Sequence, residues 1–138
     1  VIVSTHPRTR KRIEKSGADF SSLVNFMKPL GFKDYLKLQL SAKVVFSDSG
    51  TITEESSILN FKAITIRNEN ERPEGFDKGV LVMSSLCLNS FKNSVMVGLN
   101  TNGQGIVEDY RDKNVSDKVV KIICSYIDYV NSKIWLKR

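Results

Sequence analysis

The residues best suited to chemistry form one short segment, residues 47–56, with the sequence SDSGTITEES. It follows an apolar run, residues 42–46, that is typical of a buried parallel strand. A strand that turns sharply into a helix leaves the first backbone N–H groups of that helix free, and the helix dipole favours negative charge there. Ser49 supplies a small hydroxyl, and Gly50 lets a phosphate approach the backbone closely. The segment therefore predicts an anion site.

Two acidic residues lie in the first turn of the helix that this segment begins. Thr51 and Glu54 have the Thr-x-x-Glu spacing of a capping box, so we expect Glu54 to cap the helix rather than to act in catalysis. Glu55 lies one turn into the helix, where its carboxylate could accept hydrogen bonds from sugar hydroxyls. A phosphate site beside such a carboxylate indicates a nucleotide-sugar diphosphate as the ligand.

A second polar segment, residues 67–75, has the sequence RNENERPEG. Pro73 restricts the backbone of Arg72, and the Arg72 guanidinium could grip a diphosphate through two hydrogen bonds. For Arg72 taken alone, a surface salt bridge with Glu69 or Glu74 is the alternative. The Ser-Gly turn upstream favours the diphosphate interpretation.

Length and composition indicate one globular domain with no membrane partner. The chain has 138 residues, of which 41% are hydrophobic and 26% are charged, and it shows neither a membrane-spanning run nor a signal peptide. It does not begin with Met, and residues 1–3 resemble a buried strand, so we expect a piece of a longer protein. We expect Cys87 and Cys124 to be buried, reduced thiols of a cytoplasmic protein, and neither has the spacing of a metal ligand.

The formal net charge of +6 raises the possibility of a nucleic-acid partner. Much of the excess lies in residues 6–15 and in the carboxyl-terminal residues 133–138. Aromatic residues are not interleaved with these bases as stacking platforms would require, and a solvated helix face explains the first cluster more simply. We therefore expect a small phosphate ligand and no nucleic acid.

Strands and helices alternate along the predicted fold. The expected strands are residues 1–4, 24–27, 43–46, 63–66 and 80–83, the expected helices are residues 7–17, 32–41, 51–59, 88–99 and 115–135, and the expected polar loops are residues 67–78 and 100–112. This alternation predicts an α/β fold with a parallel sheet covered by helices on both faces. Ligands of such sheets bind beyond the carboxyl ends of the strands, where both polar segments lie.

The last predicted helix, residues 115–135, carries its apolar residues in one stripe. It could pack on this domain or reach back to a part of the protein outside this chain.

The two polar segments together resemble the signature of a known family. Residues 48–55, DSGTITEE, followed by residues 71–74, ERPE, look like the motifs of the non-hydrolysing UDP-N-acetylglucosamine 2-epimerases. His6-Pro7 after a strand and Phe32-x-x-Tyr35-Leu36 before the first motif also match. This form of the motifs, together with the ending SYIDYVN at residues 125–131, looks most like a capsule-sugar branch of the family. Enzymes of that branch act on the way to UDP-N-acetyl-L-fucosamine in cell-envelope polysaccharide biosynthesis.

The resemblance implies that residues 1–138 are the carboxyl-terminal, UDP-binding domain of a longer isomerase. The family has two Rossmann-like domains in the GT-B arrangement, with the active site between them, and this chain matches one of the two. The UDP-binding residues that the resemblance implies are Tyr35, Ser49, Gly50, Thr51, Glu55 and Arg72.

The resemblance also implies a role for each of these residues. Ser49 and Gly50 would bind the diphosphate, with Arg72 near the phosphates. Glu55 would hold the ribose hydroxyls, and Tyr35 would lie near the uracil.

Two further positions stand apart from this set. Thr51 replaces the more common second glycine of the motif, and its hydroxyl could substitute for a close backbone approach. His6 would border the cleft at a regulatory or second nucleotide-sugar site.

The implied reaction eliminates UDP to give a 2-acetamidoglucal and then adds it back on the other face of C2. The family's catalytic residues lie in the amino-terminal domain, so we expect no catalytic residue in this chain, no metal and no cofactor. The longer protein would be a homodimer. Two other interpretations stay open: a GT-B glycosyltransferase, and a non-catalytic module that binds a nucleotide-sugar.

Overall fold

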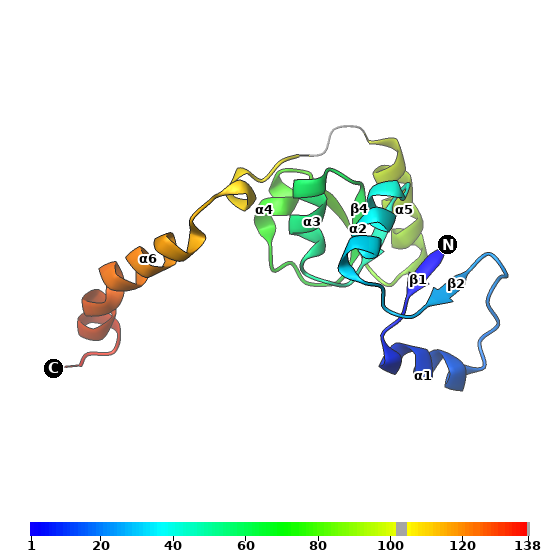
Figure 1. Ribbon diagram of the computed structural model, residues 1–138, viewed down its shortest axis with the longest axis horizontal. Coiled ribbons are helices and arrows are strands. Elements are labelled where there is room, and N and C mark those ends of the chain that lie inside the picture. Colours follow the sequence, from blue (N-terminus) through cyan, green and yellow to red (C-terminus); the bar gives the residue numbers. More distant parts are fainter. Residues whose placement is uncertain (102–104, 138) are drawn as a thin grey trace.

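The computed structural model describes residues 1–101 and 105–137 as an alternation of strands and helices (Figure 1). The strands are β1 (Ile2–Ser4), β2 (Asn25–Met27), β3 (Val45–Ser47), β4 (Ala63–Ile66) and β5 (Leu81–Ser84). The helices are α1 (Pro7–Ser16), α2 (Phe32–Ser41), α3 (Ile52–Leu59), α4 (Pro73–Asp77), α5 (Leu88–Asn100), the 3₁₀ turn η1 (Glu108–Arg111), α6 (Val115–Tyr129) and the π-helical η2 (Val130–Ile134). The predicted α/β class is confirmed.

All strand pairs are parallel, but they form two sheets. β1 pairs with β2, and β3, β4 and β5 form a second sheet with β4 in the centre. In Figure 1, β1, α1 and β2 lie to one side of the body that contains β4, α3 and α5. The predicted single sheet is thus divided between Met27 and Val45. β1, β2 and β3 have only three residues each, and none of them is fully buried.

The core surrounds β4, whose two faces are covered by different helices. Ile64 is fully buried, and a Cβ added to Gly98 would lie 3.2 Å from its Cδ1, so α5 packs directly on that face. Ala63 belongs instead to a cluster that contains Ile52 of α3. Because successive side chains of a strand point to opposite faces, α3 and α5 lie on opposite sides of the sheet, as predicted.

Local signals fixed most helix ends. α1 ends at Gly17, and α3 ends at Asn60, both in the left-handed conformation that stops a helix. Two short helices fall in segments predicted as loops. α4 begins at Pro73, a residue suited to the first turn of a helix, and η1 carries Tyr110, which packs against the core cluster.

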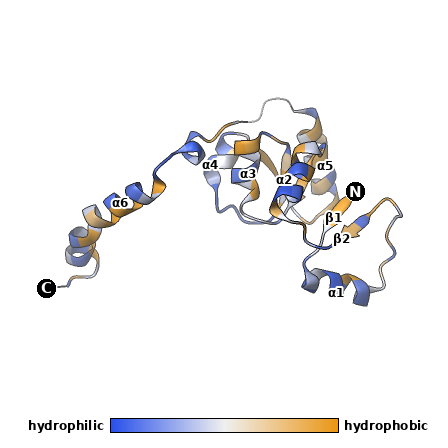
Figure 2. Cartoon of the chain, viewed as in Figure 1, coloured by the Kyte–Doolittle hydropathy of each residue, from blue (hydrophilic) through white to orange (hydrophobic). Residues whose placement is uncertain are grey.

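The carboxyl-terminal helix extends away from the rest of the molecule (Figure 1). α6 has no buried residue, and the apolar residues along it are exposed. Figure 2 marks these apolar positions on the helix by hydropathy. The sequence left open whether this helix packs on the domain or reaches another part of the protein. In the structure it does not pack on the domain. Among the described helices, none combines the length and hydropathy that a membrane crossing needs.

The prediction that both cysteines are buried is wrong. Cys87 lies at the amino-terminal cap of α5, and Cys124 lies on α6, where no neighbouring element covers it; both side chains are exposed.

The central position of Ile64 gives a test of this core. Ile64→Ala is expected to lower the free energy of unfolding by about 3 kcal/mol, because it leaves a cavity between β4 and α5. Ile58→Ala, on the exposed side of α3 where Ile58 is 49% exposed, is the matched control and is expected to cost about 0.5 kcal/mol or less. Urea denaturation followed by circular dichroism measures both, and equal losses would contradict the assignment of the core.

Candidate functional site

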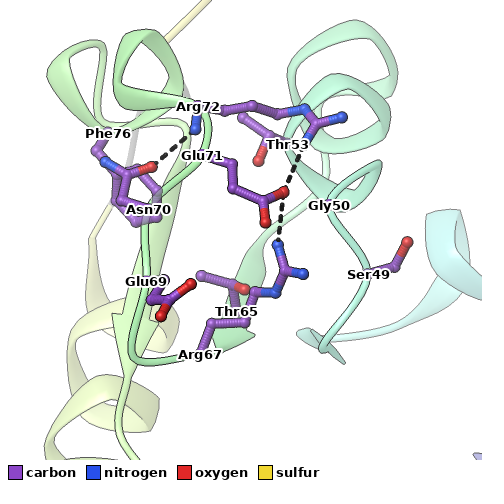
Figure 3. A pocket seen from close by; sticks show the side chains of 10 residues that line it. All are labelled: Ser49, Gly50, Thr53, Thr65, Arg67, Glu69, Asn70, Glu71, Arg72 and Phe76. Carbon is purple, nitrogen blue, oxygen red and sulfur yellow. Dashed lines mark hydrogen bonds and ion pairs between the residues drawn. The ribbon is translucent and has the colours of Figure 1, made fainter.

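Two turns at the carboxyl edge of the three-stranded sheet form the candidate site. The Ser-Gly turn, residues 47–51, joins β3 to α3, and the Arg72 loop, residues 67–72, joins β4 to α4. The parallel register places Ser47 opposite Thr65, so both turns leave the sheet at the same level. They enclose a small cavity (Figure 3), whose volume of about 10 Å³ holds roughly one water molecule.

Arg72 is the centre of an ion-pair cluster beside this cavity. Its Nε donates to Glu54 Oε1 at 2.5 Å, and its Nη1 lies 3.6 Å from Glu71 Oε2. Arg67 Nη1 donates to the same Glu71 oxygen at 3.2 Å (Figure 3). The hydrogen bond to Glu54 is the main cause that raises the pKa of Arg72 above its ordinary value.

The partners of Arg72 differ from the expected ones. The alternative salt bridge with Glu69 or Glu74 is wrong, because the guanidinium pairs with Glu54 and Glu71. Glu54 belongs to α3, whereas Arg72 lies in the loop before α4, so this ion pair joins two elements. The second carboxylate oxygen of Glu54, Oε2, is buried without a hydrogen-bond partner among the described residues.

The end of the Arg72 side chain approaches Gly50 closely. A Cβ at residue 50 would lie 2.5 Å from Arg72 Nη1, so the guanidinium lies directly against the backbone of the Ser-Gly turn. The backbone N–H groups of Gly50 and Thr51 have no hydrogen-bond partner within the described part of the chain. The turn therefore offers two free donors at a helix amino terminus beside a guanidinium, an arrangement that binds phosphate.

A second group of side chains surrounds the carboxylate of Glu55. Thr51 Oγ1 donates to Glu55 Oε1 at 2.9 Å, and Gln39 Nε2 of α2 donates to Glu55 Oε2 at 2.6 Å. Ser49 Oγ lies 3.0 Å from Thr51 Oγ1. Burial is the main cause that raises the pKa of Tyr35, and the charge of Glu55 raises it further.

The predicted capping box is absent. Thr51 already has helical backbone angles, φ −67° and ψ −12°, and its side chain makes no cap hydrogen bond. A capping residue needs an extended backbone to aim its oxygen at the free N–H groups. The Thr51 hydroxyl therefore donates to Glu55, while the Glu54 carboxylate accepts from Arg72.

The structure brings most of the predicted site residues together and leaves one apart. Ser49, Gly50 and Arg72 line the cavity, and Thr51, Glu55 and Tyr35 form the neighbouring group. His6 does not line this cavity; it is exposed, and its Nδ1 accepts from Arg8 N at 3.3 Å as the cap of α1.

Sequence reasoning missed the parts played by Arg67, Glu71 and Gln39. Gln39 alone carried a signal, as a neutral polar residue among the leucines of α2.

Comparison with known proteins places this site in a family. The sequence model of the family described as UDP-N-acetylglucosamine 2-epimerase matches residues 1–124. The chain belongs to this family. It is 30% identical over 106 residues to the UDP-N-acetylglucosamine 2-epimerase of Methanococcus maripaludis, a match that covers 74% of this chain and 29% of that protein. The resemblance drawn from the motifs is thus confirmed.

Solved epimerase structures share the fold. The UDP-N-acetylglucosamine 2-epimerase of Rickettsia bellii matches with a TM-score of 0.76 at 42% identity, covering 99% of this chain and 39% of the other. The UDP-GlcNAc 2-epimerase of Methanocaldococcus jannaschii, solved in complex with UDP-GlcNAc and UDP, matches with a TM-score of 0.72 at 25% identity, covering 90% and 35%. The chain therefore spans between 29% and 39% of the length of these three epimerases.

In this epimerase-family chain, a further hydrogen bond holds the helix that follows Arg72. Tyr110 Oη of η1 donates to Glu74 Oε1 of α4 at 2.7 Å. This bond is the main cause that lowers the pKa of Glu74. Burial is the main cause that raises the pKa of Tyr110, and the hydrogen bond to Glu74 raises it further. The contact fixes the start of α4 and with it the direction of the Arg72 loop.

Tyr110→Phe tests this support through pH. The pKa of Glu74 is expected to rise toward its ordinary value, as ¹³C NMR of the carboxyl group can follow. Because the native pKa is lowered, the bond contributes stability above the unfolded-state pKa of Glu74, and this contribution is lost as the pH falls through the native pKa. The stability difference between wild type and Tyr110→Phe should therefore be largest near neutral pH and shrink in acid.

Tyr126→Phe, on the exposed α6, is the matched control for this experiment and should leave the Glu74 titration unchanged. A Glu74 titration that is the same in Tyr110→Phe and wild type would contradict the role of this bond.

Proposed function

We propose that this chain binds the UDP part of a UDP-N-acetylhexosamine. The observation that carries the proposal is the Arg72 guanidinium, which lies against Gly50 in a turn whose backbone N–H groups at Gly50 and Thr51 have no partner among the described residues. These donors come from different elements at the same edge of the sheet, an arrangement suited to a diphosphate. The Methanocaldococcus jannaschii relative, solved in complex with UDP-GlcNAc and UDP, supports the same ligand.

In the proposed complex, the diphosphate takes the place of protein carboxylates beside Arg72. Glu71, whose side chain is 56% exposed, releases the guanidinium more readily than Glu54, because an exposed carboxylate regains its hydration on leaving. Ser49 turns its hydroxyl from Thr51 Oγ1, which it contacts in the free chain, and donates it to the phosphates instead. Glu55 accepts from the ribose hydroxyls, and Tyr35 lies against the uracil.

We further propose that the chain is the carboxyl-terminal domain of a longer 2-epimerase, in which UDP is eliminated and added back on the other face of C2. The length of the relatives supports this, since the chain spans only 29% to 39% of them. The exposed apolar stripe of α6 fits the same proposal, because such a face is normally covered by protein. His6 would border a second nucleotide-sugar site in the complete enzyme, a cytoplasmic homodimer of cell-envelope polysaccharide biosynthesis.

Isothermal titration calorimetry with UDP tests the site directly. Arg72→Ala is expected to weaken UDP binding by about 10- to 100-fold, since hydrogen bonds between charged groups contribute about 1.5–3 kcal/mol. Arg12→Ala, on the exposed α1, removes the same charge from a distant surface and is expected to leave the affinity unchanged. Equal affinity of Arg72→Ala and wild type would rule out Arg72 as a ligand of the diphosphate.

Turnover tests the proposed division of the enzyme. The 138-residue chain is expected to bind UDP-GlcNAc without exchanging its C2 proton into deuterated water, because the base that removes this proton would lie outside the chain. Proton NMR of the C2 position measures the exchange, and a longer chain that includes the amino-terminal half is the positive control. Deuterium at C2 with the 138-residue chain alone would show that it contains its own base.

A further inference from the structure

Gln39 is a buried polar residue that serves the candidate site from a distance in sequence. It is 3% exposed and is the one fully buried residue of α2. Its Nε2 donates to Glu55 Oε2 at 2.6 Å, across 16 positions of the chain. A carboxylate only accepts hydrogen bonds, so the chemistry of Glu55 fixes which end of the Gln39 amide faces it.

The other end of the amide argues against a purely structural role. Gln39 Oε1 is buried and has no hydrogen-bond partner among the described residues. A buried acceptor without a partner lowers stability, and an apolar side chain of the same size would avoid that cost. An apolar residue at position 39 could not donate a hydrogen bond to Glu55, and this bond is what the glutamine adds.

Both oxygens of Glu55 are held, and both keep capacity to accept. Thr51 donates to Oε1 at 2.9 Å and Gln39 donates to Oε2 at 2.6 Å, so the carboxylate cannot rotate freely. An ionised carboxylate has about four acceptor positions, so roughly two remain for a ligand. Two adjacent acceptors in one fixed plane match the two hydroxyls of a vicinal diol.

We propose that Gln39 is a positioning residue: it orients the Glu55 carboxylate so that the site distinguishes a ribose, with its 2′,3′-diol, from a 2′-deoxyribose. The proposal rests on the proposed function, because it takes the nucleotide sugar to lie at Glu55. Gln39 itself does not touch the ligand. It acts through Glu55, and the anion-binding half at Gly50 and Arg72 does not depend on it.

The test compares UDP with 2′-deoxy-UDP by calorimetry. Wild type is expected to bind UDP about tenfold more tightly, the value of one hydroxyl hydrogen bond to a charged group. Gln39→Met keeps the volume but removes the donor, and it should reduce this ratio to about twofold while leaving the affinity for inorganic pyrophosphate unchanged. Lys37→Met, at an exposed position of the same helix, should keep the wild-type ratio.

The outcomes separate this proposal from the proposed function. A wild-type ratio near ten that persists in Gln39→Met would overturn the role of Gln39 and leave UDP binding intact. Equal affinities of wild type for UDP and 2′-deoxy-UDP would also overturn it, because the site would then not distinguish the two sugars. Failure of wild type to bind UDP would instead reject the proposed function.

A measurement without ligand keeps the Gln39 proposal testable in that last case. The side-chain NH₂ of Gln39 should exchange with solvent slowly in wild type and faster in Glu55→Gln, as ¹⁵N-edited NMR can show. Thermal unfolding of Gln39→Met should match wild type closely, since the variant also removes the unpartnered Oε1. Exchange at the rate of a free glutamine in wild type would overturn the hydrogen bond and with it the proposal.

Discussion

The contact between the Arg72 guanidinium and the backbone of Gly50 is the constraint on which the rest of the site depends. With no Cβ at residue 50, the end of the Arg72 side chain can lie directly against the turn after β3. The register of the parallel strands brings this turn and the loop after β4 to the same level. Glu54, in the first turn of α3, holds the guanidinium there through a bond of 2.5 Å to its Nε.

The charges of the ion-pair cluster around Arg72 balance within the protein. The cluster joins two guanidinium groups, Arg67 and Arg72, to two carboxylates, Glu54 and Glu71. Glu54 and Glu71 differ in their exposure and in the distances to their partners. Glu54 is 32% exposed and is bonded at 2.5 Å, whereas Glu71 is 56% exposed and lies at 3.2 Å and 3.6 Å from its partners. An entering anion would therefore exchange with Glu71 and keep Glu54 as the group that aims Arg72.

The sequence predicted what depends on neighbouring residues and missed what depends on distant ones. The ends of α1 and α3 at Gly17 and Asn60 follow from local backbone preferences, and so does the strand-turn-helix at Gly50. The pairing of Glu54 with Arg72 joins residues 18 positions apart, and it follows only from the packing of two loops. The same holds for the separation of β1 and β2 from the other strands, because strand patterns do not specify which edges pair.

The capping box failed for a reason that clarifies how the site is divided. Thr51-x-x-Glu54 has the right spacing, yet the helical backbone of Thr51 turns its hydroxyl along the helix to Glu55, four residues on.

Glu54 and Glu55 are adjacent in sequence, so their side chains leave α3 about 100° apart. One carboxylate consequently faces the Arg72 loop, and the other faces Gln39 of α2. A single helical turn thereby serves two environments, one in which Glu54 holds the Arg72 guanidinium and one in which Glu55 is held by Gln39 and Thr51. Thr51 belongs to both, since its hydroxyl contacts Ser49 as well as Glu55. The Thr51 hydroxyl therefore ties the Ser-Gly turn to the Glu55 carboxylate beside it, so a change at either one reaches the other.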